Sequence, residues 1–406
     1  MNLRHRLGNY VVVLMLAILV SACGDDLSDL DALAKESVLN DSTNIEITTE
    51  LSVDQVVSPV AVTSDSDAEA QLLVNLSSNT ISGQVGVTPQ QNTMVRQVQI
   101  RKGFGGQNGN VVLNLSPDAT DSDRWYVPDN YLLSNEDVEL LLRGGLYVLV
   151  TTSNHANGEL RGQLLLGGQE LLINPLTADQ VASSNSGSLA SATSYLSVDY
   201  ITGEIHGSVL HADDLLPTQV SMQTGLAGLE GEAILQYQAD LNESGVWHIP
   251  EHTVLPTSLL EQLDSAQLYV QASSISYPNG EIRGQLHLFH YIVTITELSG
   301  MNLMPEINTI ASGKAFLTLN GFDGNARAIV RVSDITPLNV ILFRANNPNS
   351  TERGRGLYNL QASQDYWQLP SGVVFGNNDF NDIGNARLMF IVTSTDFPLG
   401  EIGGRI

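Results

Sequence analysis

The chain repeats one sequence pattern three times, and this repetition constrains its fold more than any other feature. Its only three tryptophans, Trp125, Trp247 and Trp367, each open the same motif of tryptophan, a variable residue, an aliphatic residue and proline. The steps between them are 122 and 120 residues. A glycine stands 33 residues after each tryptophan and opens a matching heptad, which reads GELRGQL from Gly158, GEIRGQL from Gly280 and GEIGGRI from Gly400. We therefore predict three tandem copies of one domain.

Each copy reads as an all-β domain. A unit of about 120 residues is large enough to enclose a hydrophobic core of its own. Within each unit, short segments rich in valine, leucine, isoleucine and tyrosine are separated by glycine, asparagine and proline, which is typical of a β-sandwich. The strands expected from this pattern are 70–76, 95–100, 110–115 and 146–152 in the first copy, 195–200, 219–223, 232–236 and 267–273 in the second, and 315–319, 340–343, 357–360 and 387–392 in the third.

One short helix is expected near the middle of each copy. Ser134 precedes Asp137 and an apolar set with helical spacing, and Ser258 and Glu261 form a capping-box pattern at the matching place in the second copy. The third copy has the more polar segment 377–382 there. We expect a helix of one or two turns at all three places.

The heptad is predicted to form the last strand of each copy. Asparagine precedes Gly158 and Gly280, and Asn-Gly between apolar segments is a strong signal for a two-residue hairpin turn. Strand 146–152 should therefore pair with strand 159–166. The two-residue period of a strand places Glu159, Arg161 and Gln163 on one face and Leu160, Gly162 and Leu164 on the other.

We interpret the heptad as structural. Glu159 with Arg161, and Glu281 with Arg283, are expected to share a charge-assisted hydrogen bond at an exposed site, worth about 0–1 kcal/mol. The glycines on the apolar face, Gly162 and Gly284, are expected to leave space for the tryptophan of the same copy. A catalytic role for these glutamates would need a partner carboxylate, and none recurs at fixed spacing. The third copy keeps Gly400 and Glu401 but has glycine in place of the arginine.

The first segment of the chain is expected to be a targeting signal. Residues 1–22 have a basic start, an apolar run and small residues before Cys23, which is the pattern of a secretory signal peptide. Cys23 is the only cysteine of the chain, so we expect neither a disulfide framework nor a zinc site built on several thiolates. The sequence Val20-Ser-Ala-Cys23 resembles the lipobox of bacterial lipoproteins, which implies cleavage before Cys23, its acylation with chains such as palmitate, and attachment to the membrane. Gly24 stands where aspartate commonly signals inner-membrane retention, so the resemblance favours the outer membrane of the cell envelope.

The segment 23–67 is expected to be an acidic, lipid-anchored tether, because it is rich in aspartate, serine and threonine and has no aromatic residue. An alternative is that its apolar positions within 45–62 add an edge strand. The folded copies are then expected at 68–167, 188–290 and 310–406. The formal net charge of −26 repels phosphate, so we expect no nucleic-acid partner.

A copy that ends in a GEIRGQL strand after an aromatic-containing strand resembles the CHRD (chordin-type) domain, and this resemblance covers residues 68–406. It implies an antiparallel, Greek-key-like β-sandwich of immunoglobulin-like or superoxide-dismutase-like kind. Many bacterial members carry a His-x-His-x-x-Gly stretch that could hold a metal. The matching pairs here are Gln99 with Arg101, Ser221 with Gln223, and Ile341 with Phe343. We therefore expect no metal site and no cofactor.

These features favour a non-enzymatic envelope protein with a binding, adhesion or structural role and an unidentified protein or glycan ligand. The alternative is a degenerate dismutase-like metal-binding enzyme. The pairs His248 with His252 and His287 with His290 occur only in the second copy and lack a metal-binding arrangement. Whether the acidic segments 118–123 and 377–382 hold calcium stays open, although neither has the spacing of a calcium loop.

Overall fold

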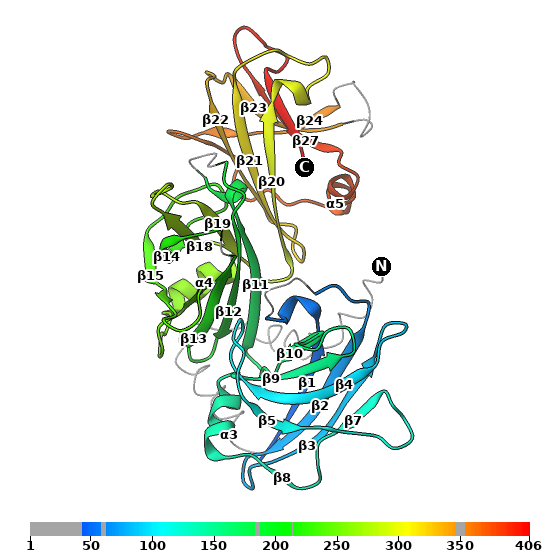
Figure 1. The fold of residues 1–406 in the computed structure, drawn as a ribbon. Coiled ribbons are helices and arrows are strands. Elements are labelled where there is room, and N and C mark those ends of the chain that lie inside the picture. The colour runs from blue at the N-terminus through cyan, green and yellow to red at the C-terminus, as the bar shows by residue number, and fades with distance from the viewer. Residues whose placement is uncertain (1–42, 58–61, 183–186, 213, 346–353) are drawn as a thin grey trace, which may run out of the picture.

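The computed structural model describes residues 43–57, 62–182, 187–212, 214–345 and 354–406. Three β-domains follow one another along the chain and are stacked end to end (Figure 1). Each is built of antiparallel strands and carries one short α-helix. The predicted all-β class and the three tandem copies are confirmed.

The three copies have the same order of elements, except that β8 of the first copy has no counterpart strand in the other two. The first copy contains β1 (Asn44–Leu51), η1 (Val53–Gln55), β2 (Asp67–Asn75), β3 (Thr80–Thr88), β4 (Val95–Lys102), β5 (Val111–Asn114), β6 (Ser116–Pro117), β7 (Arg124–Tyr126), β8 (Tyr131–Leu132), α3 (Asn135–Leu142), β9 (Leu146–Thr152) and β10 (Leu160–Gln163). The second copy contains β11 (Gln169–Thr177), η2 (Ala178–Gln180), β12 (Ser191–Asp199), β13 (Ile205–His211), β14 (Pro217–Thr224), β15 (Ala233–Gln236), β16 (Gln238–Ala239), β17 (Val246–His248), α4 (Thr257–Asp264), β18 (Leu268–Ser274) and β19 (Ile282–Leu286). The third copy contains β20 (Tyr291–Ser299), η3 (Gly300–Asn302), β21 (Ser312–Asn320), β22 (Ala326–Ser333), β23 (Asn339–Arg344), β24 (Arg355–Asn359), β25 (Gln361–Ala362), β26 (Trp367–Gln368), α5 (Asn377–Gly384), β27 (Leu388–Thr393) and β28 (Ile402–Arg405).

Each copy has two groups of strands, which form separate sheets in the first copy and parts of one sheet in the second and third copies. In the first copy the sheets have the orders β1-β2-β3-β7-β6, with β8 on β3, and β10-β9-β4-β5. The first strand approaches the heptad strand in every copy, through Ser52–Arg161, Thr177–Arg283 and Ser299–Gly403. The second and third copies consequently have one continuous path of nine strands. The first strand therefore joins the two sheets.

The three tryptophans occupy one structural position. Trp125 pairs with Val85, Trp247 with Val209, and Trp367 with Val330, each on the third strand of its copy. Every copy also has its own cluster of buried aliphatic side chains. The sequence repeat therefore corresponds to three domains in which equivalent residues occupy equivalent positions.

The heptad pairs as predicted, but its turn differs. Strand β10 runs antiparallel to β9 with Leu160 opposite Val150, and Leu160 and Leu164 lie in the core. The connection is not a two-residue turn, because residues 153–159 separate the two strands. Gly158 has a φ of +136°, and a Cβ there would lie 2.9 Å from Leu149 Cδ1, so this position requires glycine.

The three expected helices are present, and one cap differs from the prediction. Ser134 caps α3 and accepts a hydrogen bond from the Asp137 amide. Helix α4 instead begins after Pro256, and Ser258 lies inside its first turn. The capping box expected at Ser258 is therefore wrong, whereas the helix itself is where the sequence placed it.

The first strand of every copy begins before the boundary expected from the sequence. Strand β1 lies within the segment 23–67 expected as a tether, and β11 and β20 precede residues 188 and 310. Strand β1 pairs with β2 along its whole length, with Ile47 and Leu51 buried between polar neighbours. The folded part therefore starts by residue 44, and the edge-strand alternative is correct for the first half of residues 45–62.

Candidate functional site at the joints between copies

The polar face of the heptad strand is buried, contrary to the prediction that it is exposed. Glu159, Arg161 and Gln163 are 0%, 1% and 2% exposed, and their counterparts in the second copy are similarly enclosed. The glutamate and the arginine do not bind each other, since each has partners elsewhere in its copy. The heptad therefore supports two separate buried arrangements.

The first arrangement is a clamp made by the arginine. Arg161 donates to the carbonyl oxygens of Gln107, at 2.8 Å, and Phe104, at 2.9 Å. Its guanidinium carbon lies 3.7 Å from the centre of the Tyr147 ring. Gln163 accepts a third bond at 3.0 Å. The arginine thus ties the last strand of the copy to the loop between β4 and β5.

The second copy repeats this clamp atom for atom. Arg283 donates to the carbonyls of Leu229, at 2.7 Å, and Leu226, at 2.8 Å. Its guanidinium carbon lies 3.4 Å from the centre of the Tyr269 ring, and Gln285 accepts at 3.0 Å. Because the same contacts recur in both copies, the arginine clamp is a conserved part of the repeat's fold in these two copies.

The clamp holds a positive charge without a carboxylate. Among the described residues, no acidic side chain lies within ion-pair distance of Arg161 or Arg283. Burial lowers the pKa of each arginine to about 10, so both stay protonated at neutral pH. The carbonyl oxygens and the tyrosine ring supply the negative potential that stabilises the buried cation.

The clamped loop is a tight turn with glycine at its apex. The Gln107 amide donates to the Phe104 carbonyl at 3.0 Å, and Gly106 between them has a φ of +78°. A positive φ at the third position is the signature of a type II turn, which favours glycine. The second copy has the same turn at Leu226–Leu229, with Gly228 at a φ of +84°. Each arginine binds the carbonyls at both ends of its turn.

The turn of the first copy docks on the second copy. The Phe104 ring stacks on His206 with centroids 3.7 Å apart, and a Cβ at Gly106 would lie 2.9 Å from Tyr195 Cδ2. Arg143 adds an ion pair with Glu204 at 2.5 Å. Burial lowers the pKa of His206 to about 4, which keeps the stacked imidazole neutral near pH 7.

The turn of the second copy docks on the third copy in the same way. Ala227 packs with Phe316 and Ile329, and the Gly228 carbonyl accepts from Arg331 Nε at 2.8 Å. Arg327, at the position of His206, donates to the Ser265 carbonyl at 2.8 Å. The two joints therefore share one design, in which a clamped turn is seated on the outer sheet face of the next copy.

The third copy lacks the clamp. Gly403 replaces the arginine, Met389 stands at the position of the tyrosine, and Leu303 fills the space, since a Cβ at Gly403 would lie 2.7 Å from its Cδ2. The corresponding loop falls on residues 346–353, outside the described residues. The two copies that carry the arginine–tyrosine pair are the two whose turns contact a following copy.

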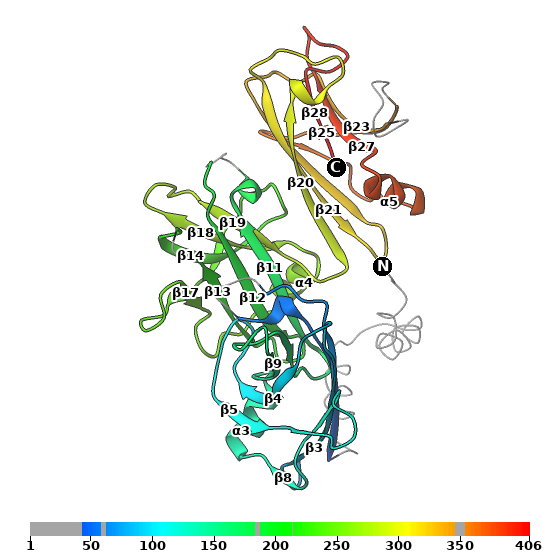
Figure 2. The same cartoon turned by 45° about the vertical axis from the view of Figure 1, so that its right-hand side comes forward.

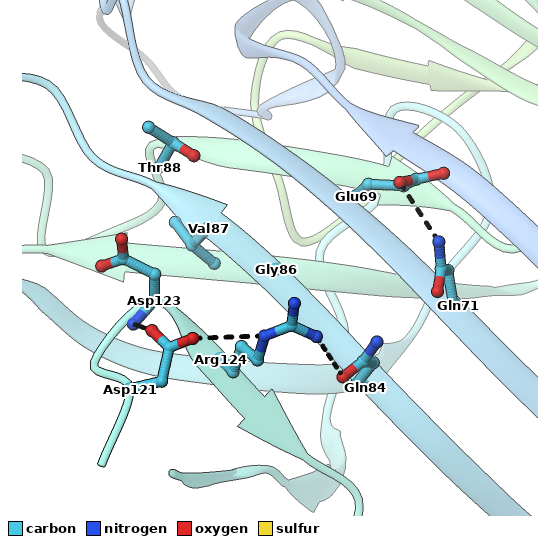
Figure 3. Close-up of a pocket in the computed structure, with 9 residues that line it drawn as sticks. All are labelled: Glu69, Gln71, Gln84, Gly86, Val87, Thr88, Asp121, Asp123 and Arg124. Atoms are coloured by element: carbon cyan, nitrogen blue, oxygen red, sulfur yellow. Dashed lines mark hydrogen bonds and ion pairs between the residues drawn. The ribbon is translucent and has the colours of Figure 1, made fainter.

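The first copy presents the same sheet face without such a turn. Gln71 and Gln84 form the cross-strand pair at the place of Tyr195 with Ser208 and of Phe316 with Ile329. Arg124 connects this pair to Asp121, with bonds of 3.0 Å to Gln84 and 3.2 Å to Asp121 (Figure 3). The face is polar, and two open hollows of about 350 Å³ and 600 Å³ border the Gln71–Gln84 pair.

The second buried arrangement is centred on the glutamate. Glu159 accepts hydrogen bonds from the hydroxyls of Ser64, Ser66 and Thr152. Burial acts to raise the pKa of Glu159, but these three donors outweigh it, so that the pKa lies below its ordinary value. Glu281 and Glu401 bind Ser188 and Thr309 in the same manner, each at 2.7 Å. The glutamate therefore fastens the segment before the second strand in all three copies.

The expected contact between heptad glycine and tryptophan is wrong. A Cβ at Gly162 would lie 2.9 Å from Leu51 Cγ, and one at Gly284 would lie 2.6 Å from the Pro175 carbonyl oxygen. Both partners belong to the first strand of the copy, which crosses over the heptad strand at this point. Glycine is needed because two backbones approach each other closely there.

The residues at the family's histidine positions form ordinary structural contacts. Gln99 donates to Asn114 at 2.8 Å, and Gln223 accepts from the Tyr269 hydroxyl at 2.6 Å. No group of three histidine, cysteine or acidic residues with metal-binding geometry occurs in the described ranges. The acidic segments 118–123 and 377–382 form no such group within these ranges.

One histidine has the connections of a hydrolytic triad. His248 lies 2.8 Å from Ser208 Oγ through Nδ1 and 2.9 Å from Asp240 through Nε2. Ser208 is fully buried, so its hydroxyl is closed to a substrate in this structure.

The predicted lipidation residue Cys23 and the signal peptide lie outside the described residues. Within the described part of the chain, none of the helices has the length and apolar character needed to span a bilayer.

The sequence reasoning missed the docking turns, although a signal for them exists. Glycines occur at Gly103 and Gly106 and again at Gly225 and Gly228, in each case with the second glycine 55 residues before the heptad arginine. This fixed offset couples the turn to its clamp.

Comparison with known proteins gives one family. The model of the CHRD domain matches residues 47–164, 173–286 and 294–406, which together cover most of the chain. These ranges include most of each first strand. No curated protein and no solved structure matched the chain.

Proposed function

Because the chain belongs to the CHRD-domain family, we propose that its three copies act together as a non-enzymatic binding module of the cell envelope. In this proposal the mature protein is attached to the membrane through a lipid on Cys23, and the outer membrane is favoured over the inner. The ligand is a protein or a glycan of the envelope surroundings.

The repeated joint is the observation that carries this proposal. The polar residues that recur in the heptads, Glu159 with Glu281 and Arg161 with Arg283, are occupied in fastening loops and seating one copy on the next. Because these side chains are buried and hydrogen-bonded within the protein, they are unavailable for chemistry on a substrate. A chain of docked domains instead offers an extended surface, and tandem modules raise avidity for a repeated ligand.

The sequence before the folded part supports the anchored location. The leader 1–22 ends in small residues directly before Cys23, the single cysteine of the chain. Acylation of that residue with several chains would give durable attachment. A linker of about 20 residues or more between Cys23 and β1 would then separate the first copy from the bilayer.

The anchor is tested by labelling cells with a palmitate analogue and fractionating their membranes. The wild-type chain should take up label and sediment with membranes, whereas Cys23→Ser should lose the label and enter the soluble fraction. An unlabelled wild-type chain would refute the anchor.

The binding role is tested by capture experiments with the full-length protein in detergent, using envelope extracts and a glycan array. A reproducible partner that binds the wild-type chain supports the proposal. Robust turnover of a substrate, with no partner captured, would contradict it.

A further inference from the structure

The outer sheet face of the first copy is the counterpart of two faces that form interfaces. In the second and third copies this face seats the clamped turn of the preceding copy. The first copy lies at one end of the stack (Figure 2), and both described turns are seated on later copies. A face that is used twice within the chain is therefore left uncovered by these turns in the first copy.

A glycine opens a hollow in the middle of this face. Gly86 on β3 occupies the register position of Leu210 and Arg331, and both of these side chains contact a docked turn. Leu210 Cδ1 lies 3.1 Å from the place of a Cβ at Gly106, and Arg331 Nε donates to the Gly228 carbonyl at 2.8 Å. A Cβ on Gly86 itself would have no atom within 4 Å beyond the adjacent residues, and a hollow of about 350 Å³ lies there (Figure 3). The first copy thus lacks the side chain that fills this position in the other two.

Two glutamates oppose each other beside this hollow. Glu50 on β1 is the cross-strand partner of Glu69 on β2, and both side chains are exposed. Like charges directly opposite each other destabilise a sheet. Among the described residues, no basic side chain lies within ion-pair distance of either glutamate. The described part of the chain therefore supplies no counter-charge to this pair.

The third copy shows how the same pair of positions binds a cation. Its equivalents are Glu297 and Lys314, which are cross-strand partners with the ammonium 3.6 Å from the carboxylate. The Lys314 ammonium also donates to the Asp179 carbonyl of the second copy at 3.1 Å, so this cation belongs to the second joint. The second copy has the uncharged pair Pro175 and Thr193 at this place. The first copy thus opposes two carboxylates where the third copy has an ion pair.

The lining of the hollow has the same sign of charge. Asp121 and Asp123 line it together with Glu69. The single basic side chain of the lining, Arg124, is already bound to Asp121 at 3.2 Å (Figure 3). Such a surface attracts a cation and repels an anion.

We propose that this face docks a basic turn of a partner protein, with a lysine or arginine side chain in the hollow over Gly86 and its charge at Glu50 and Glu69. The equivalent faces of the other two copies bind turns, which indicates the shape of the occupant, and the opposed carboxylates indicate its charge. A second copy of this chain is a poor occupant, because the formal net charge of −26 makes two chains repel each other. The proposal rests on the proposed binding role and specifies the class of partner.

The test uses the full-length protein in detergent and three labelled cyclic hexapeptides. Each peptide contains four glycines and two copies of lysine, glutamate or glutamine. We expect fluorescence anisotropy to show binding of the lysine peptide, weakening as the salt concentration rises, and no binding of the other two peptides. Absence of lysine-peptide binding at low salt would overturn the proposal.

Gly86→Leu is the informative variant, because it copies Leu210 of the second copy and fills the hollow without a change of charge. Glu69→Gln removes the charge and keeps the shape. We expect each to weaken binding of the lysine peptide by about tenfold, which corresponds to about 1.4 kcal/mol. Gly384→Leu and Glu139→Gln are the matched controls, because a Cβ at Gly384 also has no close contact and Glu139 is exposed on α3, outside this face. Both controls should bind the lysine peptide as the wild-type chain does.

Each other outcome decides a separate point. Equal binding of the lysine peptide by the wild-type chain and by both face variants overturns the site. Binding of the glutamine peptide as tight as that of the lysine peptide overturns the basic class. Self-association in sedimentation experiments that is lost in Gly86→Leu makes the occupant a second copy and overturns the basic partner.

The proposed function fails or stands separately. A partner from envelope extracts that both face variants retain overturns the docking site and leaves the binding role intact. Binding of the lysine peptide that is lost in both face variants supports the docking site even where the extracts yield no partner, and the missing partner then counts against the proposed function alone.

Discussion

Replacing Arg161 by alanine should loosen the first copy and its joint together. The substitution removes hydrogen bonds from a charged donor to two carbonyls and the stacking on Tyr147. Bonds to charged groups contribute about 1.5–3 kcal/mol each. Release of the cost of burying the guanidinium offsets part of this loss. We expect the free energy of unfolding of the first copy to fall by about 3 kcal/mol.

The effect is measured by hydrogen exchange and urea unfolding of the full chain. The amides of Gln107 and Gly109 donate to Phe104 O and the Tyr147 hydroxyl, so their exchange should accelerate in Arg161→Ala. Exchange should also rise on the face of the second copy that receives the turn. Tryptophan fluorescence should detect unfolding of the first copy at lower urea.

Arg124→Ala is the matched control, because Arg124 is an arginine of the same copy whose side chain is 51% exposed. It should change stability by less than about 0.5 kcal/mol. A destabilisation of Arg161→Ala equal to that of Arg124→Ala, with unchanged exchange at Gln107, would refute the clamp.

Three further predictions concern the joint and the buried glutamate. Gly106→Ala forces a Cβ against Tyr195 at a positive φ and should weaken the first joint by about 1–2 kcal/mol, which faster hydrogen exchange across β12 and β13 would show. Gly86→Ala is the control, because no atom lies within 4 Å of its Cβ, and it should be neutral. Equal effects of the two substitutions would contradict the docking. The pKa of His206 is lowered to about 4, below its ordinary value of 6.5, so its contribution to the joint is complete above about pH 6.5 and is lost as the pH falls towards 4. His206→Asn should flatten this dependence in unfolding experiments, and an unchanged slope would rule the histidine out. Glu159→Gln places an amide donor among hydroxyl donors and should cost about 1–3 kcal/mol at pH 7. Because the Glu159 pKa is lowered, the cost of Glu159→Gln should shrink as the pH falls below about 4.5. Substitution of the exposed Glu139 by glutamine should show no such change. A cost of Glu159→Gln that is independent of pH would contradict an ionised Glu159 as the hydrogen-bond acceptor.

The threefold repeat and the alternation of buried residues in the heptad could be predicted, because both follow from the spacing of residues along the sequence. Constant offsets placed Trp125 and its counterparts in one register, and the two-residue period placed Leu160 and Leu164 in the core. The first strands were harder to detect. The sequence of β1, NIEITTEL, buries two aliphatic side chains between polar residues and resembles a polar linker when read alone.

The burial of Arg161 and Glu159 could not be predicted from residue type, since charged side chains are seldom fully buried. Their partners are carbonyls and hydroxyls that lie up to 95 positions away in the chain, and such contacts leave no local pattern.

The distance between copies, measured in solution, tests the central claim most directly. Since Cys23 is the only cysteine of the chain, a Cys23→Ser background allows spin labels at two introduced cysteines. One replaces the exposed Ser78 in the first copy and the other the exposed Asn242 in the second. Docked copies predict a single narrow distance distribution that broadens in Arg161→Ala. A broad distribution in the wild-type chain, or a narrow one that the substitution leaves unchanged, would contradict the account of the heptad as the element that seats one copy on the next.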